Sequence, residues 1–314
     1  MGDAGVTSVV ISEFMDEQAV EGLRAEFNVT YEPGLVDDLP ALRAALATAQ
    51  ALIVRNRTQV REELLRHAPA LRVVGRLGVG LDNIDMGLCG SRGIRVIPAL
   101  GANAQAVAEY VIATAMLLLR GAYASSQQVG AGAWPRAALS EGREIGGKAL
   151  GLLGFGDIGR RTASLARALG MRVLAHDPML DSASPLWGET GAQRCELDEL
   201  LAGCDVLSLH VPLNPATRGL IDEQRLARMR PEAVLINTAR GGVVDETALA
   251  DALHAGRLAG AALDVFGQEP LPAGSPLAGV PNLLLTPHIA GLTRESNLRV
   301  SSLIAEQVGA FLRA

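Results

Sequence analysis

The chain has 314 residues, of which 49% are hydrophobic and 20% charged, and its formal net charge is -6. This length is typical of two domains, and this composition excludes fibrous and disordered proteins. A general nucleic-acid binder is disfavoured as well, because such proteins carry a basic surface and an aromatic content of 3% leaves few platforms for stacking bases. Any anionic ligand must therefore be bound by a local cluster of basic residues.

Strand and helix patterns alternate from Thr7 to Pro98. Short β-branched runs (TSVVIS, NVTYEP, ALIV and LRVVG) are separated by amphipathic stretches (DEQAVEGLRAEF, LPALRAALATA and VREELLRHA). Such alternation predicts a doubly wound α/β domain, in which helices cover both faces of a parallel sheet.

Three arginines follow strands of this first series. Arg55 and Arg57 come directly after the run ALIV, and Arg76 ends the run LRVVGR. If these two strands are parallel neighbours, the three guanidinium groups lie near one carboxyl edge of the sheet and form an anion site. The alternative is that they are ordinary solvated residues at the starts of loops.

A long helical pattern follows, from Ala104 to about Arg120. Its most apolar part, residues 110–119, is bounded by charged residues and is shorter than the ~18 residues that indicate a membrane span. We therefore expect a buried helix and no contact with a membrane.

A second and longer series of strands and helices begins near Lys148 and predicts a second doubly wound parallel sheet. A last helical pattern covers residues 293–312. It is a candidate connector between domains, as is the long helical pattern of residues 104–120. Its apolar residues lie roughly on one face: Leu298, Leu303, Ile304, Val308 and Phe311.

The second series opens with a glycine-rich loop. Gly154, Gly156 and Gly159 follow the apolar run ALGLL and precede the helical pattern RRTASLARALG, as in the dinucleotide-binding fingerprint. There the first glycine permits a tight turn, the second lets the pyrophosphate approach the backbone, and the third lets helix and strand pack closely.

The loop alone could be an ordinary turn. However, Asp177 ends the next strand, 18 residues after Gly159, where it can accept hydrogen bonds from both ribose hydroxyls. Because a carboxylate there repels a 2′-phosphate, we expect NAD rather than NADP.

Three polar residues follow later strands, at the edge where open α/β sheets bind ligands. Arg240 follows AVLINTA, Glu269 follows ALDVFGQ and His288 follows LLLTP. An arginine fork suits a carboxylate, and a His–Glu pair favours an imidazole that exchanges a proton with a reacting oxygen. Each residue also has an ordinary interpretation, as a loop cap, a solvated turn acid or a loop histidine. If all three residues had only these ordinary roles, their positions beside a nucleotide loop would require three coincidences.

The cysteines and the start of the chain indicate a cytoplasmic protein. Cys89, Cys195 and Cys204 are odd in number and match neither a disulfide framework nor a zinc site, so we expect reduced thiols and no metal. The first 14 residues have no basic residue ahead of their apolar stretch, so no targeting segment is expected.

These motifs resemble the D-isomer-specific 2-hydroxyacid dehydrogenase family, and within it the phosphoglycerate dehydrogenase-like branch. The matching segments are GRLGVGLDNID (75–85), GANAQAVAEYVI (101–112), LGFGDIG (153–159), HVPLNPATRGLI (210–221), INTARGGVVDE (236–246), ALDVFGQEP (262–270) and TPHIAG (286–291). The resemblance implies a Rossmann NAD-binding domain, residues 101–289, inserted into a flavodoxin-like substrate domain, residues 1–100 and 290–314. It also implies a short form without C-terminal regulatory domains.

The resemblance implies roles for the residues of a reactive site. Arg240 would bind the substrate carboxylate and polarise the keto group, and Glu269 would hold the imidazole. His288 would be the general acid in reduction and the general base in oxidation. The backbone amides of Val79 and Gly80 would contact the substrate.

The resemblance also implies a set of NAD-binding residues. The set comprises Gly154, Gly156, Asp157, Ile158, Gly159, Asp177, His210, Thr217, Thr238, Asp264 and Gly291. Asp157 and Ile158 would lie beneath the pyrophosphate, and Asp264 would contact the nicotinamide carboxamide. His210 is almost as readily interpreted as an ordinary strand-end residue.

The substrate is expected to be a small 2-hydroxy acid with a second anionic group. The run Arg55-Asn56-Arg57-Thr58 resembles the phosphate-contacting loop of phosphoglycerate dehydrogenases. In a chain of net charge -6, these arginines and Arg76 would form an anion site separate from Arg240, with all of them facing one cleft. We therefore expect 3-phosphoglycerate or a sulfonate such as 3-sulfolactate. The two remain open, because both groups present three oxygens.

Two other functions remain open. A glyoxylate or hydroxypyruvate reductase needs no second anion site and often prefers NADP, so Asp177 and the arginines disfavour it. A non-catalytic, NAD(H)-sensing corepressor would keep the fold but is expected to carry disordered interaction tails, which the sequence lacks.

The segment between the long helix and the glycine loop resembles the dimerisation arm of the family. It covers residues 121–150 and contains Trp134, which needs a partner to cover it if the arm is exposed. We therefore expect a homodimer, although a tryptophan packed within its own subunit is the alternative.

Overall fold

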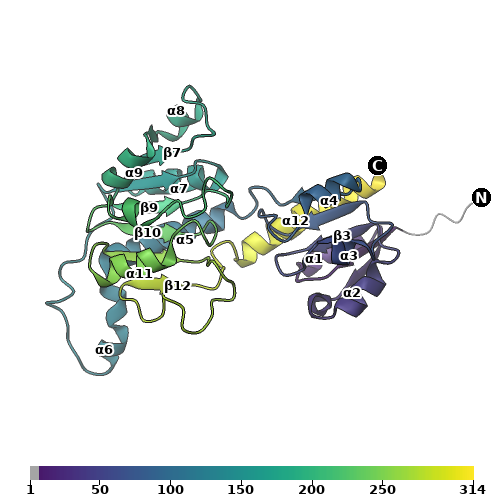
Figure 1. Ribbon diagram of the computed structural model, residues 1–314, viewed down its shortest axis with the longest axis horizontal. Coiled ribbons are helices and arrows are strands. Elements are labelled where there is room, and N and C mark those ends of the chain that lie inside the picture. Colours follow the sequence, from purple (N-terminus) through teal and green to yellow (C-terminus); the bar gives the residue numbers. More distant parts are fainter. Residues whose placement is uncertain (1–6) are drawn as a thin grey trace, which may run out of the picture. The chain divides into compact units, whose positions relative to one another are not determined.

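The computed structural model describes residues 7–314 and divides into two compact units (Figure 1). Unit 1 contains the chain up to Asn103 and again from Leu292 onward, and unit 2 contains Ala104–Gly291. The first six residues, on which the expected absence of a targeting segment partly rests, lie outside the described residues.

Unit 1 is built on a five-stranded parallel sheet of order β2-β1-β3-β4-β5, which is the flavodoxin-like order. The strands are β1 (Ser8–Ile11), β2 (Asn28–Tyr31), β3 (Ala51–Val54), β4 (Val73–Arg76) and β5 (Arg95–Pro98). β3 and β4 pair directly, with Val54 opposite Arg76. The condition for the three arginines to share one carboxyl edge is therefore met.

Helices cover both faces of this sheet because successive strand residues point to opposite sides. Val10, Leu52 and Val74 pack on one side, and Val9 and Ile53 on the other. The first side is covered by α2 (Leu39–Leu46), α3 (Glu62–Leu65) and α4 (Met86–Ser91), and the second by α1 (Glu17–Arg24) and α12 (Arg294–Arg313). A 3₁₀ helix, η1 (Pro33–Asp37), precedes α2.

Helix α12 attaches the end of the chain to unit 1. Its buried stripe recurs at every fourth position: Val300, Ile304, Val308 and Leu312. A Cβ atom on Gly75 of β4 would lie 2.8 Å from both Ile304 and Val308, so glycine is needed for this close packing. Full burial of such side chains contributes about 1.5–3 kcal/mol each. Leu298, which we expected on the same face, is 40% exposed because it lies to the side of the stripe.

Unit 2 is built on a seven-stranded sheet of order β12-β11-β10-β9-β6-β7-β8, in which all pairs are parallel. Its strands are β6 (Ala149–Leu153), β7 (Arg172–His176), β8 (Gln193–Arg194), β9 (Val206–Leu209), β10 (Val234–Asn237), β11 (Gly260–Leu263) and β12 (Leu283–Leu285). This is the Rossmann order with one added edge strand. The strands run outward from the β6–β9 pair in both directions along the sheet, so the topological switch point lies between β6 and β9. The predicted fold class is thus confirmed for both sheets.

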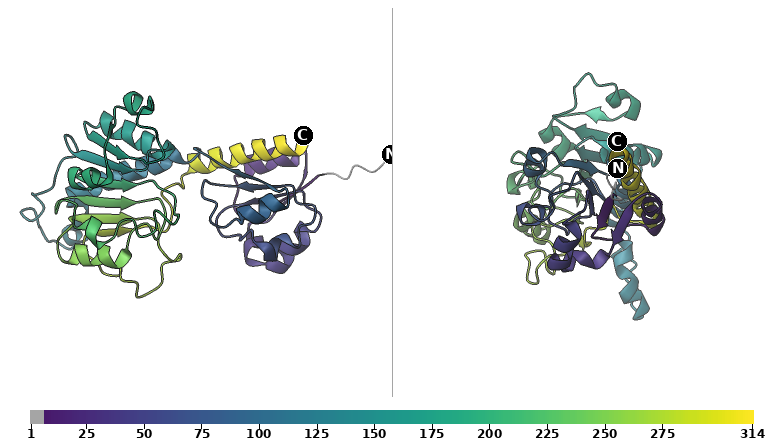
Figure 2. Two further views of the ribbon diagram at one scale, coloured as in Figure 1. Left: turned by 45° about the horizontal axis from the view of Figure 1, so that its top comes forward. Right: turned by 90° about the vertical axis from the view of Figure 1, so that its right-hand side faces the viewer.

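Two layers of helices cover the sheet of unit 2. One layer consists of α5 (Ala104–Arg120), α7 (Asp157–Ala168) and α8 (Leu186–Thr190). The other consists of α9 (Leu197–Gly203), α10 (Glu223–Leu226) and α11 (Glu246–His254). In chain order, η2 (Ala122–Ser125) and α6 (Ser126–Gly130) follow α5 and extend away from the sheet in Figure 1 and in the right-hand view of Figure 2.

Helix α5 forms where the long helical pattern predicted it, but its apolar run is buried on one side only. Val111 and Ala115 face the core, whereas Met116 and Leu117 are 45% and 37% exposed. Among residues 7–314, no helix combines the length and the apolar character needed to cross a membrane.

Candidate active site

The glycine loop after β6 has the shape that a dinucleotide requires. Gly154 has a φ of 96°, and a Cβ atom there would lie 2.7 Å from the carbonyl oxygen of His210. A Cβ atom on Gly159 would lie 2.5 Å from the carbonyl oxygen of Gly154. Gly156 differs, because a Cβ atom there would meet no heavy atom within 4 Å. Gly154 and Gly159 are therefore needed for packing. Gly156 faces open space at the start of α7, where a pyrophosphate can approach the backbone.

Asp177 lies directly after β7, where its carboxylate also holds the glycine loop. Oδ2 accepts the Phe155 N–H at 2.8 Å, and Oδ1 accepts the Met179 N–H at 2.9 Å. A carboxylate oxygen can accept more than one hydrogen bond, so both oxygens remain able to bind ribose hydroxyls. The contact with Phe155 was not predicted, because it joins two loops that are separated by a whole helix and a strand.

Two buried polar atoms at the same edge of the sheet lack a partner among the described residues. They are Nδ1 of His210, after β9, and Oγ1 of Thr238, after β10. Burial lowers the pKa of His210 to about 4, and its Nε2 lies 3.0 Å from Oγ of Ser208. Unpaired polar atoms beside a glycine loop are groups that a bound ligand can satisfy, so these residues fit a dinucleotide.

Other residues of the predicted cofactor set are used locally. Asp157 opens α7, and its carboxylate pairs with Arg160 one turn on. The hydroxyl of Thr217 donates to the carbonyl of Pro212 at 2.6 Å and accepts the N–H of Asn214 at 2.9 Å, so it stabilises its own turn.

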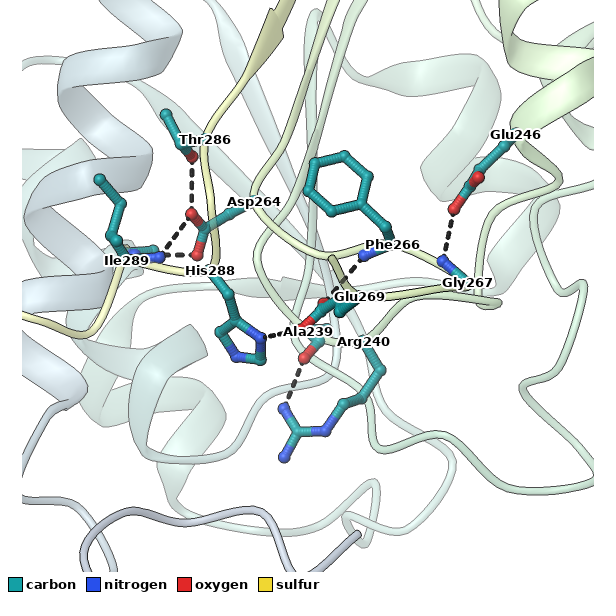
Figure 3. A network of polar contacts seen from close by, with 11 residues as sticks. Ala239, Arg240, Glu246, Asp264, Phe266, Gly267, Glu269, Thr286, His288 and Ile289 are labelled. Carbon is teal, nitrogen blue, oxygen red and sulfur yellow. Dashed lines mark hydrogen bonds and ion pairs between the residues drawn. The ribbon is translucent and has the colours of Figure 1, made fainter. Parts of the chain in front are cut away.

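Three neighbouring strands place the predicted reactive residues. Arg240 follows β10, Glu269 follows β11 and His288 follows β12. Nδ1 of His288 lies 2.7 Å from Oε2 of Glu269, and Oε1 of Glu269 accepts the Phe266 N–H at 3.0 Å (Figure 3). Nη1 of Arg240 donates to the carbonyl of Ala239 at 2.6 Å. The structure thus brings Glu269 and His288 into direct contact.

The electrostatics of Glu269 reflect this contact. Partial burial is the largest single influence and raises its pKa. The hydrogen bonds from His288 and from the Phe266 backbone, with the charges of His288 and Arg240, outweigh burial, so the pKa of Glu269 lies below its usual value. The carboxylate is therefore ionised near neutral pH.

Two further contacts lock the loops of Arg240 and Glu269 together. A Cβ atom on Gly241 would overlap the backbone carbonyl of Phe266. Oε1 of Glu246, at the start of α11, accepts the N–H of Gly267 at 2.6 Å (Figure 3). Both residues lie in the motif INTARGGVVDE, but the motif did not indicate which loop they support.

Asp264, at the end of β11, is 1% exposed and faces the loop of His288. Oδ1 accepts the hydroxyl of Thr286 at 2.6 Å and the N–H of Ile289 at 2.8 Å, and Oδ2 accepts the N–H of Ala290 at 2.8 Å. The resemblance implies that this residue contacts the nicotinamide, and in the structure its carboxylate also holds the loop that carries His288. Gly291 follows directly and ends unit 2.

In unit 1, each of the predicted anion-binding arginines has a partner within the protein. Nη2 of Arg55 donates to Oδ1 of Asn297 at 2.9 Å. Burial lowers the pKa of Arg55, and the negative charge of Glu13, which raises the pKa, only partly compensates. Arg57 forms an ion pair with Asp37, in which both side chains are exposed.

Arg76 lies over the loop that follows β4. Its Nη1 donates to the carbonyl of Leu77 at 3.1 Å, and its guanidinium occupies the space that a Cβ atom on Gly78 would need. Val79 and Gly80 follow in the same loop and are half-buried.

Glu13 is a residue of this region that sequence reasoning missed. It is 5% exposed, and its carboxylate accepts backbone N–H groups of Arg55 at 2.9 Å, Thr58 at 3.0 Å and Arg57 at 3.1 Å. A buried carboxylate thus holds the Arg55–Thr58 loop from within. A single acidic residue after β1 carries no sequence signal for this task.

The cysteines take no part in either region. All three are buried and free, and burial raises the pKa of Cys195 to about 11 and that of Cys204 to about 12. Within residues 7–314, no group of three or more His, Cys, Asp or Glu side chains could hold a metal ion.

A Rossmann sheet with this glycine loop, an acidic residue after its second strand and a His–Glu pair at its carboxyl edge defines a nicotinamide-dependent dehydrogenase. The family model described as D-isomer specific 2-hydroxyacid dehydrogenase, NAD binding domain, matches residues 112–290.

Similar proteins agree with this class. An (S)-sulfolactate dehydrogenase from Chromohalobacter salexigens is 52% identical over 303 residues, which cover 96% of this chain and 97% of that protein. A D-3-phosphoglycerate dehydrogenase from Mycobacterium leprae is 38% identical over 300 residues, which cover 96% of this chain but 56% of that protein. The crystal structure of D-lactate dehydrogenase from Aquifex aeolicus, complexed with NAD and lactic acid, has a TM-score of 0.82 at 30% identity and covers 98% of this chain and 96% of that one.

The chain therefore belongs to the D-isomer-specific 2-hydroxyacid dehydrogenase family, in its phosphoglycerate dehydrogenase-like branch. It is an NAD-dependent oxidoreductase, which confirms the expected enzyme class and cofactor.

Proposed function

We propose that the chain catalyses the reversible, NAD-dependent oxidation of (S)-3-sulfolactate to the corresponding 2-keto acid. The observation that carries the proposal is the 52% identity over nearly the whole length of an (S)-sulfolactate dehydrogenase, against 38% for a phosphoglycerate dehydrogenase of which the chain spans about half. Sulfolactate is also a small 2-hydroxy acid with a second anionic group, as the sequence predicts.

The configuration of this substrate agrees with a D-specific family. In D-lactate the carboxylate outranks the methyl group, and the centre is named R. In sulfolactate the sulfur-bearing CH₂ outranks the carboxylate, so the same spatial arrangement is named S. (S)-3-Sulfolactate therefore presents its hydroxyl, hydrogen and carboxylate as D-lactate does.

His288 is proposed as the general base of the oxidation. The ionised carboxylate of Glu269 can only accept, so the 2.7 Å contact places a proton on Nδ1 of His288 and leaves Nε2 of the neutral ring as the acceptor. Nε2 would take the proton of the substrate hydroxyl and return it in the reverse reduction. Glu269 keeps the ring in this tautomer and orientation.

Arg240 is proposed to bind the substrate carboxylate through its guanidinium. NAD, when bound, would supply the acceptor for the hydride of C2, and His288 would take the hydroxyl proton, so that the alcohol becomes a ketone. Val79 and Gly80 are proposed to contact the substrate through their backbone amides.

The proposed NAD-binding residues lie in unit 2. The glycine loop would receive the pyrophosphate at the open face of Gly156, and Asp177 would bind the ribose hydroxyls. The unpaired atoms of His210 and Thr238 support a polar ligand at the same edge. The remaining members of the predicted set keep their proposed roles: Asp157, Ile158, Thr217, Asp264 and Gly291.

The sulfonate is proposed to bind to Arg55, Arg57 and Arg76. The parallel pairing of β3 and β4 supports this assignment, because it places the three residues at one edge of the sheet of unit 1. A phosphate monoester would bind the same groups, and 3-phosphoglycerate is therefore the competing substrate.

We further propose that unit 1 is the substrate domain and unit 2 the NAD-binding domain of a cytoplasmic homodimer. Free, buried thiols are typical of a reducing compartment. Trp134 is 78% exposed on the segment that follows α6, which supports its covering by a partner copy.

A panel of 2-hydroxy acids with NAD tests the proposed function. The panel contains sulfolactate, 3-phosphoglycerate, lactate, glycerate and malate, and kcat/KM is measured for wild type and for Arg57→Ala. Arg24→Ala is the matched control, because Arg24 is also an exposed arginine of unit 1 in an ion pair.

We expect wild type to favour sulfolactate over lactate. Arg57→Ala should reduce this preference about tenfold or more, since a charge-assisted hydrogen bond contributes about 1.5–3 kcal/mol. An unchanged preference in Arg57→Ala would remove Arg57 from the anion site. The panel is extended in the reverse direction with glyoxylate and hydroxypyruvate, each with NADH and with NADPH, and a wild type that is most active on these with NADPH would instead support a reductase.

A further inference from the structure

His288 lies in a loop whose backbone conformation needs support. Its φ of 57° falls in the left-handed region that residues other than glycine rarely adopt. Just beyond β12 the Thr286 N–H still donates to the Leu263 carbonyl at 3.0 Å, but no described strand includes the residues that follow, so neighbouring groups help to keep the imidazole in place.

The carboxylate of Asp264 contacts this loop on both sides of His288. It accepts the hydroxyl of Thr286 at 2.6 Å, before the histidine, and the N–H groups of Ile289 and Ala290, each at 2.8 Å, after it (Figure 3). The carboxylate itself is 1% exposed, its bond from Ala290 is buried, and its bonds from Thr286 and Ile289 are partly buried, so water competes little with this group. The residues before and after His288 are thus bound to a single rigid group at the end of β11.

A second hydroxyl extends the network to helix α5. Oη of Tyr110 lies 2.6 Å from Oγ1 of Thr286. The only hydroxyl hydrogen of Thr286 is donated to Oδ1 of Asp264, the oxygen that also accepts the N–H of Ile289. Tyr110 must therefore donate to Thr286, and the chain of bonds has one direction: Tyr110 to Thr286 to Asp264.

We propose that Thr286 and Tyr110 are positioning residues for His288, a role that rests on the proposed function of His288 as the base. Without the Thr286 hydroxyl, the buried carboxylate loses a donor and the loop loses its side-chain anchor ahead of the histidine, so that only the backbone bond from the Thr286 N–H to Leu263 remains there. Proton transfer depends on alignment within fractions of an ångström, so a small displacement of the imidazole slows the reaction without weakening the binding of NAD.

Three substitutions separate this role from simple packing. Thr286→Val has nearly the same shape but no hydroxyl, Thr286→Ser keeps the hydroxyl, and Tyr110→Phe removes one hydroxyl from an unchanged ring. Thr190→Val is the matched control, because its hydroxyl donates only to the backbone of its own helix α8 among the described contacts. The measurements are kcat, KM, the NADH Kd and the primary isotope effect with substrate deuterated at C2.

We expect Thr286→Val to lower kcat about ten- to a hundredfold, with KM and the NADH Kd changed less than about twofold. The isotope effect on kcat should rise, because hydride transfer becomes rate-limiting. Tyr110→Phe should lower kcat about three- to tenfold, the effect of one neutral hydrogen bond. Thr286→Ser and Thr190→Val should resemble wild type. Equal losses in Thr286→Val and Thr286→Ser would overturn the proposal.

A readout that needs no turnover keeps this test separate from that of the proposed function. The chain has five histidines, and His288→Gln assigns the downfield proton resonance of the Nδ1–H that Glu269 accepts. This resonance should persist in Thr286→Ser and broaden or disappear in Thr286→Val. If wild type oxidises no 2-hydroxy acid, the proposed function fails, whereas an unaltered resonance in Thr286→Val overturns the positioning role.

Discussion

The three glycines of the loop after β6 differ in what a methyl group would meet. At Gly159 it would collide with the carbonyl of Gly154, whereas at Gly156 it would enter open space. Gly159 is therefore needed by the fold, whereas Gly156 leaves room for the dinucleotide that we propose binds there. This difference makes the cofactor assignment testable with two alanine substitutions.

We predict that Gly156→Ala leaves the free energy of unfolding within about 0.5 kcal/mol of wild type but weakens NADH binding at least about tenfold. Gly159→Ala should lower the free energy of unfolding by about 1–3 kcal/mol through overpacking. Urea unfolding and NADH fluorescence titration measure the two quantities. Normal NADH affinity in Gly156→Ala would place the pyrophosphate elsewhere.

His210 predicts a pH dependence of stability. Its folded pKa is about 4, below its ordinary value of 6.5, so the unfolded chain binds more protons between these two pH values. Stability therefore falls as the pH drops through this window. Between about pH 7 and pH 5, wild type should lose about 1–2 kcal/mol more than His210→Asn in urea unfolding. An equal loss in both proteins would contradict a neutral, buried His210.

At the scale of single residues, the sequence predicted Arg240, Glu269 and His288 because each is a reactive residue type directly after a strand of a parallel sheet. It did not predict the tasks of Glu13 or Glu246. Their partners are backbone N–H groups of distant loops, and a contact of this kind leaves no spacing pattern in the chain.

At the scale of elements, alternation of apolar and polar runs predicted both sheets and the helices that cover them. The exposed side of α5 and the position of Leu298 were misjudged. A periodic pattern shows that a helix is amphipathic, but which angular sector is buried depends on the elements that it meets in three dimensions.

The loop after β3 provides a prediction at this scale. Replacing Glu13 by Gln keeps one acceptor oxygen but puts an NH₂ group in place of the other, so at least one of the three backbone N–H groups that the carboxylate now satisfies faces a donor. We predict a loss of about 2–4 kcal/mol in the free energy of unfolding and a KM for sulfolactate that rises more than that for lactate. Glu21→Gln, at an exposed position of α1, is the control. Parallel changes in both KM values would separate this loop from anion recognition.

At the scale of the whole molecule, the exposed apolar residues after α5 predict self-association. Tyr123 and Trp134 are 66% and 78% exposed, and α6 and η2 extend away from the sheet (Figure 2). The chain has two tryptophans, and the other, Trp187, is buried and stacked on Phe155.

Trp187→Phe therefore leaves Trp134 as the only tryptophan. We predict a dimer in sedimentation experiments, with Trp134 emission that shifts to the red on dilution as its partner dissociates. Trp134→Ala should weaken the dimer. A monomer at all concentrations, with red-shifted emission throughout, would contradict this assembly.

The most direct test of the proposed function is the initial rate of NADH formation by the purified wild-type protein with each enantiomer of 3-sulfolactate. We predict rapid NAD reduction with the S enantiomer and at least about a hundredfold lower kcat/KM with the R enantiomer, whose hydrogen and hydroxyl are exchanged relative to His288. Oxidation of the R enantiomer at an equal or higher rate, or no reduction of NAD with either, would contradict the proposed function.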